Sequence, residues 1–351
     1  MKKWLYISAL SVVLLLSAVV GWTWFRDNRM PNFGDHALLY VRPGMKSDDI
    51  VRLISKQCTI RNRKSLTSVF KTKEVDKYIK PGFYRIAPRN SSVQVARMLN
   101  NGWQTPVKLT LSGSLRSKDA LAAKVASQMM LDSASFRRAL DDEELLSLYD
   151  VTPRTVFALF IPDTYEMYWS ASVEDILQRQ KQAYDAFWTT ERLEKADRLG
   201  LTKMQVSILA SIVKGETHNK EEMPRVAGVY LNRLKIGMML QADPTVAWCF
   251  DYKPSRILKK HLAVDSPYNT YRHAGLPPGP INVPDKTYID AVLNADFGTA
   301  DGRPGRSGNL YFCANPDFSG THVFAKTLSA HEKNARAFQS ELDRRARAKR
   351  K

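Results

Sequence analysis

Cysteine is scarce in this sequence, which has only Cys58, Cys249 and Cys313 among its 351 residues. Their number is odd and no CxxC pair occurs, so neither a disulfide framework nor a zinc knuckle is indicated. The six histidines form no HExxH or HxxxH pair, which argues against a metal site. We therefore expect isolated thiols and a function that needs no metal or cofactor.

Acidic residues are also in short supply, since 35 Asp and Glu stand against 53 Lys and Arg, for a net charge of +18. Such an excess favours an anionic partner: nucleic acid, a membrane surface or an acidic polymer. Hydrophobic residues make up 44% and charged residues 25% of the chain. These fractions are typical of a folded protein and exclude wholesale disorder.

One long uncharged run, residues 4–25, lies near the N-terminus and reads WLYISALSVVLLLSAVVGWTWF. A helix needs roughly 20 residues to cross the hydrocarbon core, and tryptophans at both ends of the run suit the membrane interfaces. Lys2 and Lys3 before it favour a cytoplasmic N-terminus. A cleaved signal peptide is the alternative, but the run exceeds the roughly 7–15 residues of such peptides and no clear A-x-A site follows.

Both interpretations export the remaining residues, and no second run of spanning length occurs. A nucleic-acid partner is therefore disfavoured, and no nucleic-acid-binding motif accompanies the charge. We predict a single-pass protein of the cell inner membrane. Residues 1–3 would be cytoplasmic, 4–25 a transmembrane helix, 26–36 a linker, and everything beyond them periplasmic or otherwise extracytoplasmic.

Short strands and helices alternate over residues 37–130. Each expected strand (38–41, 82–86 and 107–111) is followed by a turn and by a helix with one apolar face. This pattern is typical of α+β or α/β modules. It resembles a LysM-like carbohydrate-binding module, and a packing or spacer domain is the alternative.

The remainder, residues 131–351, has a different character. A long amphipathic helix is expected from Ser172 to Trp188, with further helices to about Ile236. Loops rich in Pro and Gly follow, then a short strand near 310–313, a polar helix and a basic tail over 344–351. The chain as a whole is predicted to be an α+β protein.

Glu216 is the most informative residue. It stands seven residues after Leu209 and three after Val213, so it shares the apolar face of an expected helix over 206–213. Partial removal from water and the nearby helix C-terminus both disfavour its ionised form and raise its pKa. A general acid needs such an environment to hold its proton near neutral pH. The alternative is a glutamate at a frayed helix end that points to solvent.

Two loop clusters follow, LQADPT at 240–245 and SPYNTY at 266–271, and both combine amide, hydroxyl and aromatic groups. Sugar sites use neutral hydrogen-bond partners and flat apolar surfaces of this kind. Ordinary turn chemistry is the alternative, because Asn, Asp, Pro and Gly dominate turns. The candidates for substrate binding are Gln241, Asp243, Thr245, Asn269, Thr270 and Tyr271. Thr321 is a less favoured candidate, and His322 is expected to be structural.

The segments ASIVKGET, VYLNRLKIGMMLQADPTV, SPYNTY, GLPPGPI and GTHVFAKTLSAH closely resemble those of the MltG (YceG-like) endolytic murein transglycosylases. The resemblance covers essentially the whole chain and is strongest from Ser211 to His331. It implies a YceG-like catalytic domain over 131–351 with a lysozyme-like active site. It also implies cleavage, without water, of the β-1,4 bond between N-acetylmuramic acid and N-acetylglucosamine in nascent peptidoglycan. The product would carry a 1,6-anhydro end, and glycan elongation would terminate.

Glu216 aligns with the second glutamate of the family's E-K-E-T-like segment, whereas Lys214 replaces the first. The helical face selects Glu216 independently, although a lysine that turned toward it would oppose its upward pKa shift. A mechanism with one carboxylate follows. Glu216 protonates the leaving oxygen, the sugar's N-acetyl group stabilises the cationic centre, and Glu216 then takes the proton of the C6 hydroxyl. Asp243 is the best candidate for a second carboxylate but is expected to order its loop.

The expected partners are peptidoglycan glycan strands, the cell membrane through the N-terminal helix, and peptidoglycan synthases. Two other functions stay open. One is a hydrolytic muramidase on the same scaffold, and the other is a non-catalytic peptidoglycan-binding scaffold, for which Lys214 is the support.

Overall fold

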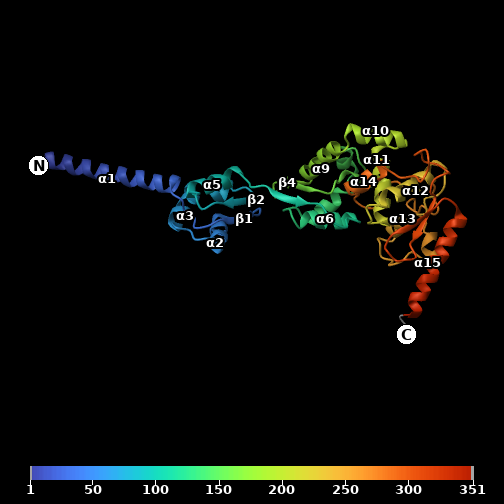
Figure 1. Ribbon diagram of the computed structural model, residues 1–351. Helices are drawn as coiled ribbons and strands as arrows, with labels where there is room; N and C mark the ends of the chain where they lie inside the picture. The colour runs from blue at the N-terminus through green and yellow to red at the C-terminus, as the bar shows by residue number, and fades with distance from the viewer. Residues whose placement is uncertain (1, 349–351) are drawn as a thin grey trace. The chain divides into compact units, whose positions relative to one another are not determined.

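The computed structural model describes residues 2–348, and the chain divides into two compact units (Figure 1). The first unit comprises residues 1–109, 128–132 and 164–172, and the second comprises 110–127, 133–163 and 173–351. Met1 and the last three residues of the predicted basic tail, 349–351, lie outside the described residues. The fold is mixed α+β, as expected.

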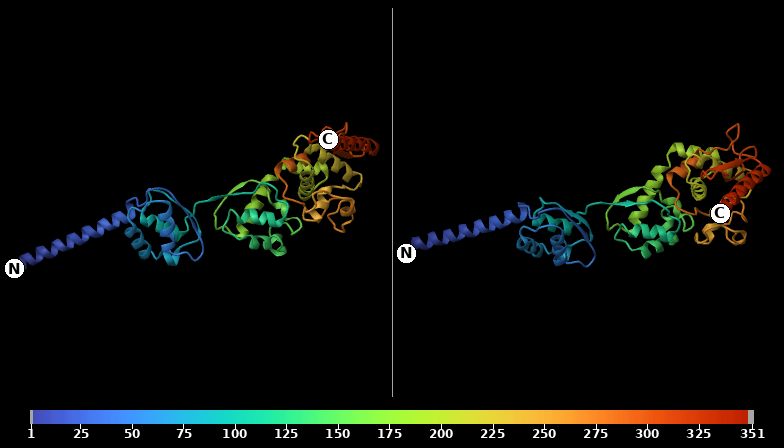
Figure 2. Two further views of the ribbon diagram at one scale, coloured as in Figure 1. Left: turned by 90° about the horizontal axis from the view of Figure 1, so that it is seen from below. Right: turned by 60° about the horizontal axis from the view of Figure 1, so that its bottom comes forward.

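Helix α1 (Lys2–Arg29) carries the apolar run and projects alone from the first unit in every view (Figure 2). Its stretch 6–29 is long and apolar enough to cross a membrane, and the protein buries none of the apolar window within it. Large apolar side chains such as Leu14 and Leu15 are exposed along it. Water disfavours a continuous apolar surface of this kind, whereas the interior of a bilayer suits it.

The rest of the first unit is built around the antiparallel pair β1 (Ala37–Val41) and β2 (Gly82–Ile86), in which Leu39 faces Tyr84. β1 buries every second residue, as a strand with one face on a core must. Four helices complete the core: α2 (Ser47–Gln57), α3 (Arg63–Thr72), α4 (Val75–Tyr78) and α5 (Ser92–Asn101). The sequence pattern predicted both strands, α2 and α5, and missed α3 and α4.

The segment predicted as a linker, residues 26–36, belongs to the fold of the first unit. Its first residues continue α1 as far as Arg29. Phe33 is fully buried, and the backbone N–H of Gly34 donates to the carbonyl of Thr59 at 2.8 Å. Burial of an aromatic side chain is a large favourable term, so this segment is held in place rather than left as a spacer.

The third predicted repeat does not extend the β1–β2 pair. Its strand, β3 (Val107–Thr110), pairs instead with β4 (Thr164–Met167), more than fifty residues later in the chain. The helix predicted to follow it is α6 (Lys118–Ala126), which Ser117 caps and which belongs to the second unit. The three repeats are alike locally, and their pairing partners distinguish them.

The core of the second unit contains α11 (Lys203–Glu216), α12 (Met223–Lys235) and α14 (Lys286–Leu293), which pack against one another. Strands β5 (Tyr311–Ala314) and β6 (His322–Ala325) form an antiparallel pair beside α12. The remaining helices and 3-10 turns are α7 (Ser133–Ala139), α8 (Glu143–Ser147), η1 (Val156–Leu159), α9 (Val173–Phe187), α10 (Thr190–Leu199), α13 (Asp243–Cys249), η2 (Lys259–Ala263) and α15 (Leu328–Ala348).

Gly228 permits a close approach between α12 and the backbone near residue 296. A Cβ atom at this position would lie 1.9 Å from the carbonyl oxygen of Asp296 and 3.1 Å from Cα of Phe297. The backbone N–H of Asp296 donates to the carbonyl of Pro224 on the same helix at 2.9 Å. The approach therefore holds the following loop against the helix that carries part of the candidate site.

Candidate active site

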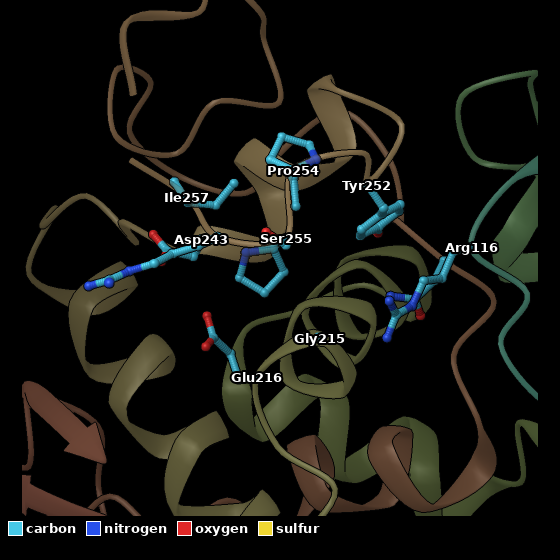
Figure 3. A pocket seen from close by; sticks show the side chains of 12 residues that line it. Arg116, Gly215, Glu216, Asp243, Tyr252, Pro254, Ser255 and Ile257 are labelled. Carbon is cyan, nitrogen blue, oxygen red and sulfur yellow. The ribbon is translucent and has the colours of Figure 1, made fainter. Parts of the chain in front are cut away.

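Glu216 is the last residue of α11 and lines a pocket of about 250 Å³. Ile212 and Val213 in the preceding turn are fully buried, as their spacing predicts, but all residues from 206 to 213 are buried, so the helix is enclosed on every side. Glu216 itself is partly buried. Its carboxyl points away from the end of the helix toward Asp243 and Ser255 (Figure 3).

The pocket lies between the end of α11, the start of α13 and the loop over residues 252–257. Asp243 lies on one side of it, and Arg116 and Tyr252 lie on the other (Figure 3). The Arg116 guanidinium lies over the Tyr252 ring, 5.3 Å from its centroid. Gly215 permits close packing here, since a Cβ atom would lie 2.5 Å from Cβ of Pro244. The site thus combines carboxyl groups, a cation and an aromatic face.

Tyr230 on α12 donates a hydrogen bond from its hydroxyl to Oε1 of Glu216 at 2.6 Å. Burial raises the pKa of Glu216 to about 7, and the negative charge of Asp243 acts in the same direction. The hydrogen bond from Tyr230 and the positive charge of Arg233 oppose the rise. Near neutral pH this carboxyl therefore occupies both protonation states.

Arg233 lies three residues after Tyr230 on the same helix and is buried. Its Nε donates to the carbonyl of Leu310 at 2.7 Å and its Nη1 to the carbonyl of Leu240 at 2.6 Å. Burial lowers the pKa of this guanidinium. Neither Tyr230 nor Arg233 was among the predicted site residues. Their i,i+3 spacing on an apolar helix face was the available signal.

Lys214 does not turn toward Glu216. Its Nζ lies 2.7 Å from Oδ2 of Asp285 and donates to the carbonyl of Val283 at 2.9 Å. The cation that lowers the pKa of Glu216 is Arg233 instead. Lys214, which stands in place of the first glutamate, therefore forms an ion pair within the fold.

Lys214→Met is expected to lower the free energy of unfolding by about 1–3 kcal/mol, because Asp285 and the Val283 carbonyl lose a charged partner. The pKa of Glu216 should stay unchanged. Urea denaturation and an NMR titration of the Glu216 carboxyl measure these two quantities. Lys220→Met, at an exposed position, is the matched control and should change stability by less than about 0.5 kcal/mol. A change in the pKa of Glu216 in the Lys214→Met protein would contradict the structural role given to Lys214.

The structure brings the two predicted sugar-binding loops together. Tyr271 donates from its hydroxyl to Oδ1 of Asp243 at 2.6 Å, and Asp243 lines the pocket. Gln241 has a φ of 50°, and its backbone N–H donates to the carbonyl of Thr270 at 3.1 Å. Its side chain is exposed. Of the six predicted substrate-binding residues, one, Asp243, lines the pocket.

Thr245, Asn269 and Thr270 are buried, and their polar atoms are used within the protein. The hydroxyls of Thr245 and Thr270 lie 2.9 Å apart. The amide of Asn269 donates to the carbonyls of Leu262 and Val264, and its oxygen accepts from the backbone N–H of Tyr271. These three residues order the loops in this structure, and a sugar contact from them stays a prediction.

His322 has a structural environment, as expected. Its Nδ1 lies 3.0 Å from Oε2 of Glu222, and its backbone N–H donates to Oε1 of the same carboxyl at 2.7 Å. Thr321, the less favoured candidate, accepts a hydrogen bond from the amide of Asn315 at 3.1 Å. Neither residue lines the pocket.

The sequence model of the YceG-like family matches residues 39–337. The chain belongs to the YceG-like family. A curated relative from Bacillus subtilis, named endolytic murein transglycosylase, is 27% identical over 312 residues, which cover 84% of this chain and 82% of the relative. A Streptococcus pneumoniae protein of the same name is 24% identical over 367 residues, which cover 93% of this chain and 64% of that protein.

A crystal structure of a YceG-like protein from Listeria monocytogenes has a similar fold. The two structures give a TM-score of 0.53 at 28% sequence identity. The similarity covers 85% of this chain and 98% of that chain. The shared fold therefore extends over nearly the whole of the Listeria protein.

Proposed function

We propose that this lytic transglycosylase cleaves the β-1,4 bond between N-acetylmuramic acid and N-acetylglucosamine in nascent peptidoglycan, with Glu216 as its acid and base. The observation that carries the proposal is the carboxyl of Glu216, whose pKa burial raises to about 7 at the wall of an open pocket. Such a carboxyl can donate a proton near neutral pH and accept one once ionised. The names of the relatives support murein as the substrate.

The proposed reaction uses Glu216 twice. It first donates its proton to the glycosidic oxygen as the bond from C1 to that oxygen breaks. The carbonyl oxygen of the sugar's own N-acetyl group supplies electrons to C1. Glu216, now a carboxylate, takes the proton of the C6 hydroxyl while the C6 oxygen bonds to C1 and the acetamido oxygen leaves C1 with its electrons, which restores the N-acetyl group. The product is a 1,6-anhydro end, no water is consumed, and Glu216 regains its proton.

Asp243 is proposed to support this chemistry without reacting. Ordinary glycosidases use two carboxyl groups, one as the acid and one as the nucleophile or base. The carboxylate of Asp243 already accepts a hydrogen bond from the hydroxyl of Tyr271, and this bond holds the loop of Asp243 in place. Its negative charge raises the pKa of Glu216 and so favours the proton-carrying form.

The first unit is proposed to be a LysM-like module that binds the glycan, and α1 to span the inner membrane with its N-terminus in the cytoplasm. The order strand, helices, strand from β1 to β2 supports the module. The exposed apolar surface of α1 supports the span. Termination of glycan elongation next to peptidoglycan synthases would follow from this placement.

Digestion of purified glycan strands by the full-length chain, followed by mass spectrometry of the fragments, tests the reaction. We expect 1,6-anhydro ends. Reducing ends in their place would indicate a hydrolytic muramidase. Undigested strands that still bind the protein would indicate a non-catalytic scaffold.

Tyr230→Phe and Asp243→Asn are expected to move the alkaline limb of the pH profile of kcat/KM in opposite directions. Protonated Glu216 starts the reaction, so activity falls as the pH rises through its pKa of about 7. Loss of the Tyr230 hydrogen bond raises that pKa and moves the limb to higher pH. Loss of the Asp243 charge lowers it and moves the limb to lower pH. Limbs that move together would contradict these roles.

A further inference from the structure

Helix α1 is joined to the rest of the first unit by hydrogen bonds. The hydroxyl of Ser65, in the first turn of α3, donates to Asp27 on α1 at 2.5 Å and lies 2.9 Å from the hydroxyl of Ser92 in α5. The amide of Asn32 donates to Ser92 at 2.9 Å and to the carbonyl of Asn62 at 3.0 Å. The first turns of α3 and α5 therefore lie beside the end of α1.

This junction lies at the depth of the lipid headgroups if α1 spans a membrane. The uncharged run ends at Phe25. Asp27, two residues later, lies about 3 Å farther along a helix axis. The polar layer on each side of a bilayer is roughly 5–8 Å thick. The hydrogen bonds of Asp27 therefore hold the folded part of the first unit against that layer.

Five cations surround the junction, and we name them together the junction surface: Arg29, Arg61, Arg63, Lys64 and Arg89. The backbone N–H of Arg61 donates to the carbonyl of Asn32 at 2.8 Å, and the N–H of Asn32 donates to the carbonyl of Asn90, the neighbour of Arg89. All five side chains are exposed. Within residues 2–348 none of the five has a carboxylate partner.

Two of these cations are placed where they disfavour the fold. Arg63 and Lys64 begin α3, whose first turn contains no acidic residue. The N-terminus of a helix carries partial positive charge, so cations there are unfavourable. Helix α2 of the same unit has the opposite arrangement, with Asp48 and Asp49 in its first turn. The stability of α3 therefore does not account for Arg63 and Lys64.

We propose that the junction surface binds the anionic phospholipid headgroups of the leaflet from which α1 emerges. Lysines and arginines beside a membrane helix are attracted to anionic lipids. Such attraction acts within a Debye length of the membrane, about 8–10 Å at physiological salt, and the five cations lie in segments joined by hydrogen bonds beside the end of α1. The inference rests on the proposed membrane span of α1 and adds to it a lipid contact made by the folded module.

Hydrogen exchange of the full-length chain in nanodiscs tests the contact. The nanodiscs contain phosphatidylcholine alone or with phosphatidylglycerol, and the segments followed are 60–68 and 87–92. We expect phosphatidylglycerol to slow amide exchange in both segments by about threefold or more. Raised salt should remove most of that protection, because it screens the charges.

Two double variants with equal charge change supply the control. Arg63→Glu with Lys64→Glu should abolish the protection, whereas Lys71→Glu with Lys73→Glu, at the other end of α3, should retain it. The first pair is also expected to keep or raise Tm, because it removes cations from the positive end of the helix. Lost protection in that variant would then not reflect unfolding.

The outcomes separate the inference from the span. A chain that does not enter nanodiscs overturns the span together with the lipid contact. A chain that enters them but exchanges equally in both lipids overturns the lipid contact alone. Equal loss of protection in both double variants also overturns the lipid contact, because the net charge of the chain and not the position of the cations would then explain the protection. Protection by soluble peptidoglycan fragments in neutral nanodiscs, with none by phosphatidylglycerol, would assign the surface to an anionic polymer instead.

Discussion

Glu216→Gln is expected to lower the rate of glycan-strand cleavage by on the order of 10³-fold, within the range measured for loss of a general acid or base. The amide keeps the size of the side chain but cannot donate a proton to the glycosidic oxygen. It also cannot accept the proton of the C6 hydroxyl, so both steps fail. Fragments carrying 1,6-anhydro ends, counted by mass spectrometry, measure the loss.

The same variant should remain folded. Burial raises the pKa of Glu216 to about 7 in the folded state, above the value of about 4.3 typical of an unfolded chain. Stability is therefore lost as the pH rises between these two values, because the unfolded chain ionises this carboxyl over that range whereas burial keeps it protonated in the folded state. Glu216→Gln removes that cost and should have a Tm at pH 8 equal to or above that of the wild type. Glu221→Gln, at an exposed position, is the activity control. Equal digestion by the wild type and by both variants would show that Glu216 takes no part in the reaction.

Gly228→Ala is expected to lower the free energy of unfolding by about 2 kcal/mol or more, as over-packing of a tight contact does. Helix propensity alone predicts the opposite sign, with a gain of about 1 kcal/mol for Ala over Gly within a helix. We expect the steric contact to outweigh helix propensity, because the new Cβ would lie 1.9 Å from a backbone oxygen that no side-chain rotation can move away. Urea denaturation measures the loss.

Gly305→Ala is the matched control for this change. Gly305 has no heavy atom within 4 Å of the added Cβ and does not have a positive φ. Its effect should stay below about 0.5 kcal/mol. A Gly228→Ala protein as stable as the control would show that α12 shifts freely. Such freedom would also weaken the case that α12 fixes Tyr230 against Glu216.

The features predicted well from the sequence are those that depend on neighbouring residues. The buried helix that ends at Glu216, the helix after β3 and the strands β1 and β2 follow from local spacing. These signals arise within one helix or one strand. They need no knowledge of which distant segment lies opposite.

The features that were missed depend on partners far apart in the sequence. The Lys214 ion pair joins positions 214 and 285, and the β3–β4 pair joins segments more than fifty residues apart. The loops around Asn269 show the same limit. Amide and hydroxyl groups that bind a sugar and those that order a turn have the same composition. The structure adds that Asn269 and Thr270 are buried, whereas Asp243 lines the pocket.

The junction at the end of α1 also bears on how readily proteases could separate the folded part of the chain from the proposed membrane anchor. Proteases cut chain that is exposed and locally unfolded. Here the helix continues to Arg29, and Asn32 and Phe33 are already buried, so only a short exposed segment lies between them for a protease to cut. Cleavage at this point would first require the junction to open. If α1 is the membrane anchor proposed above, release of the folded part by cleavage at this point is thereby disfavoured.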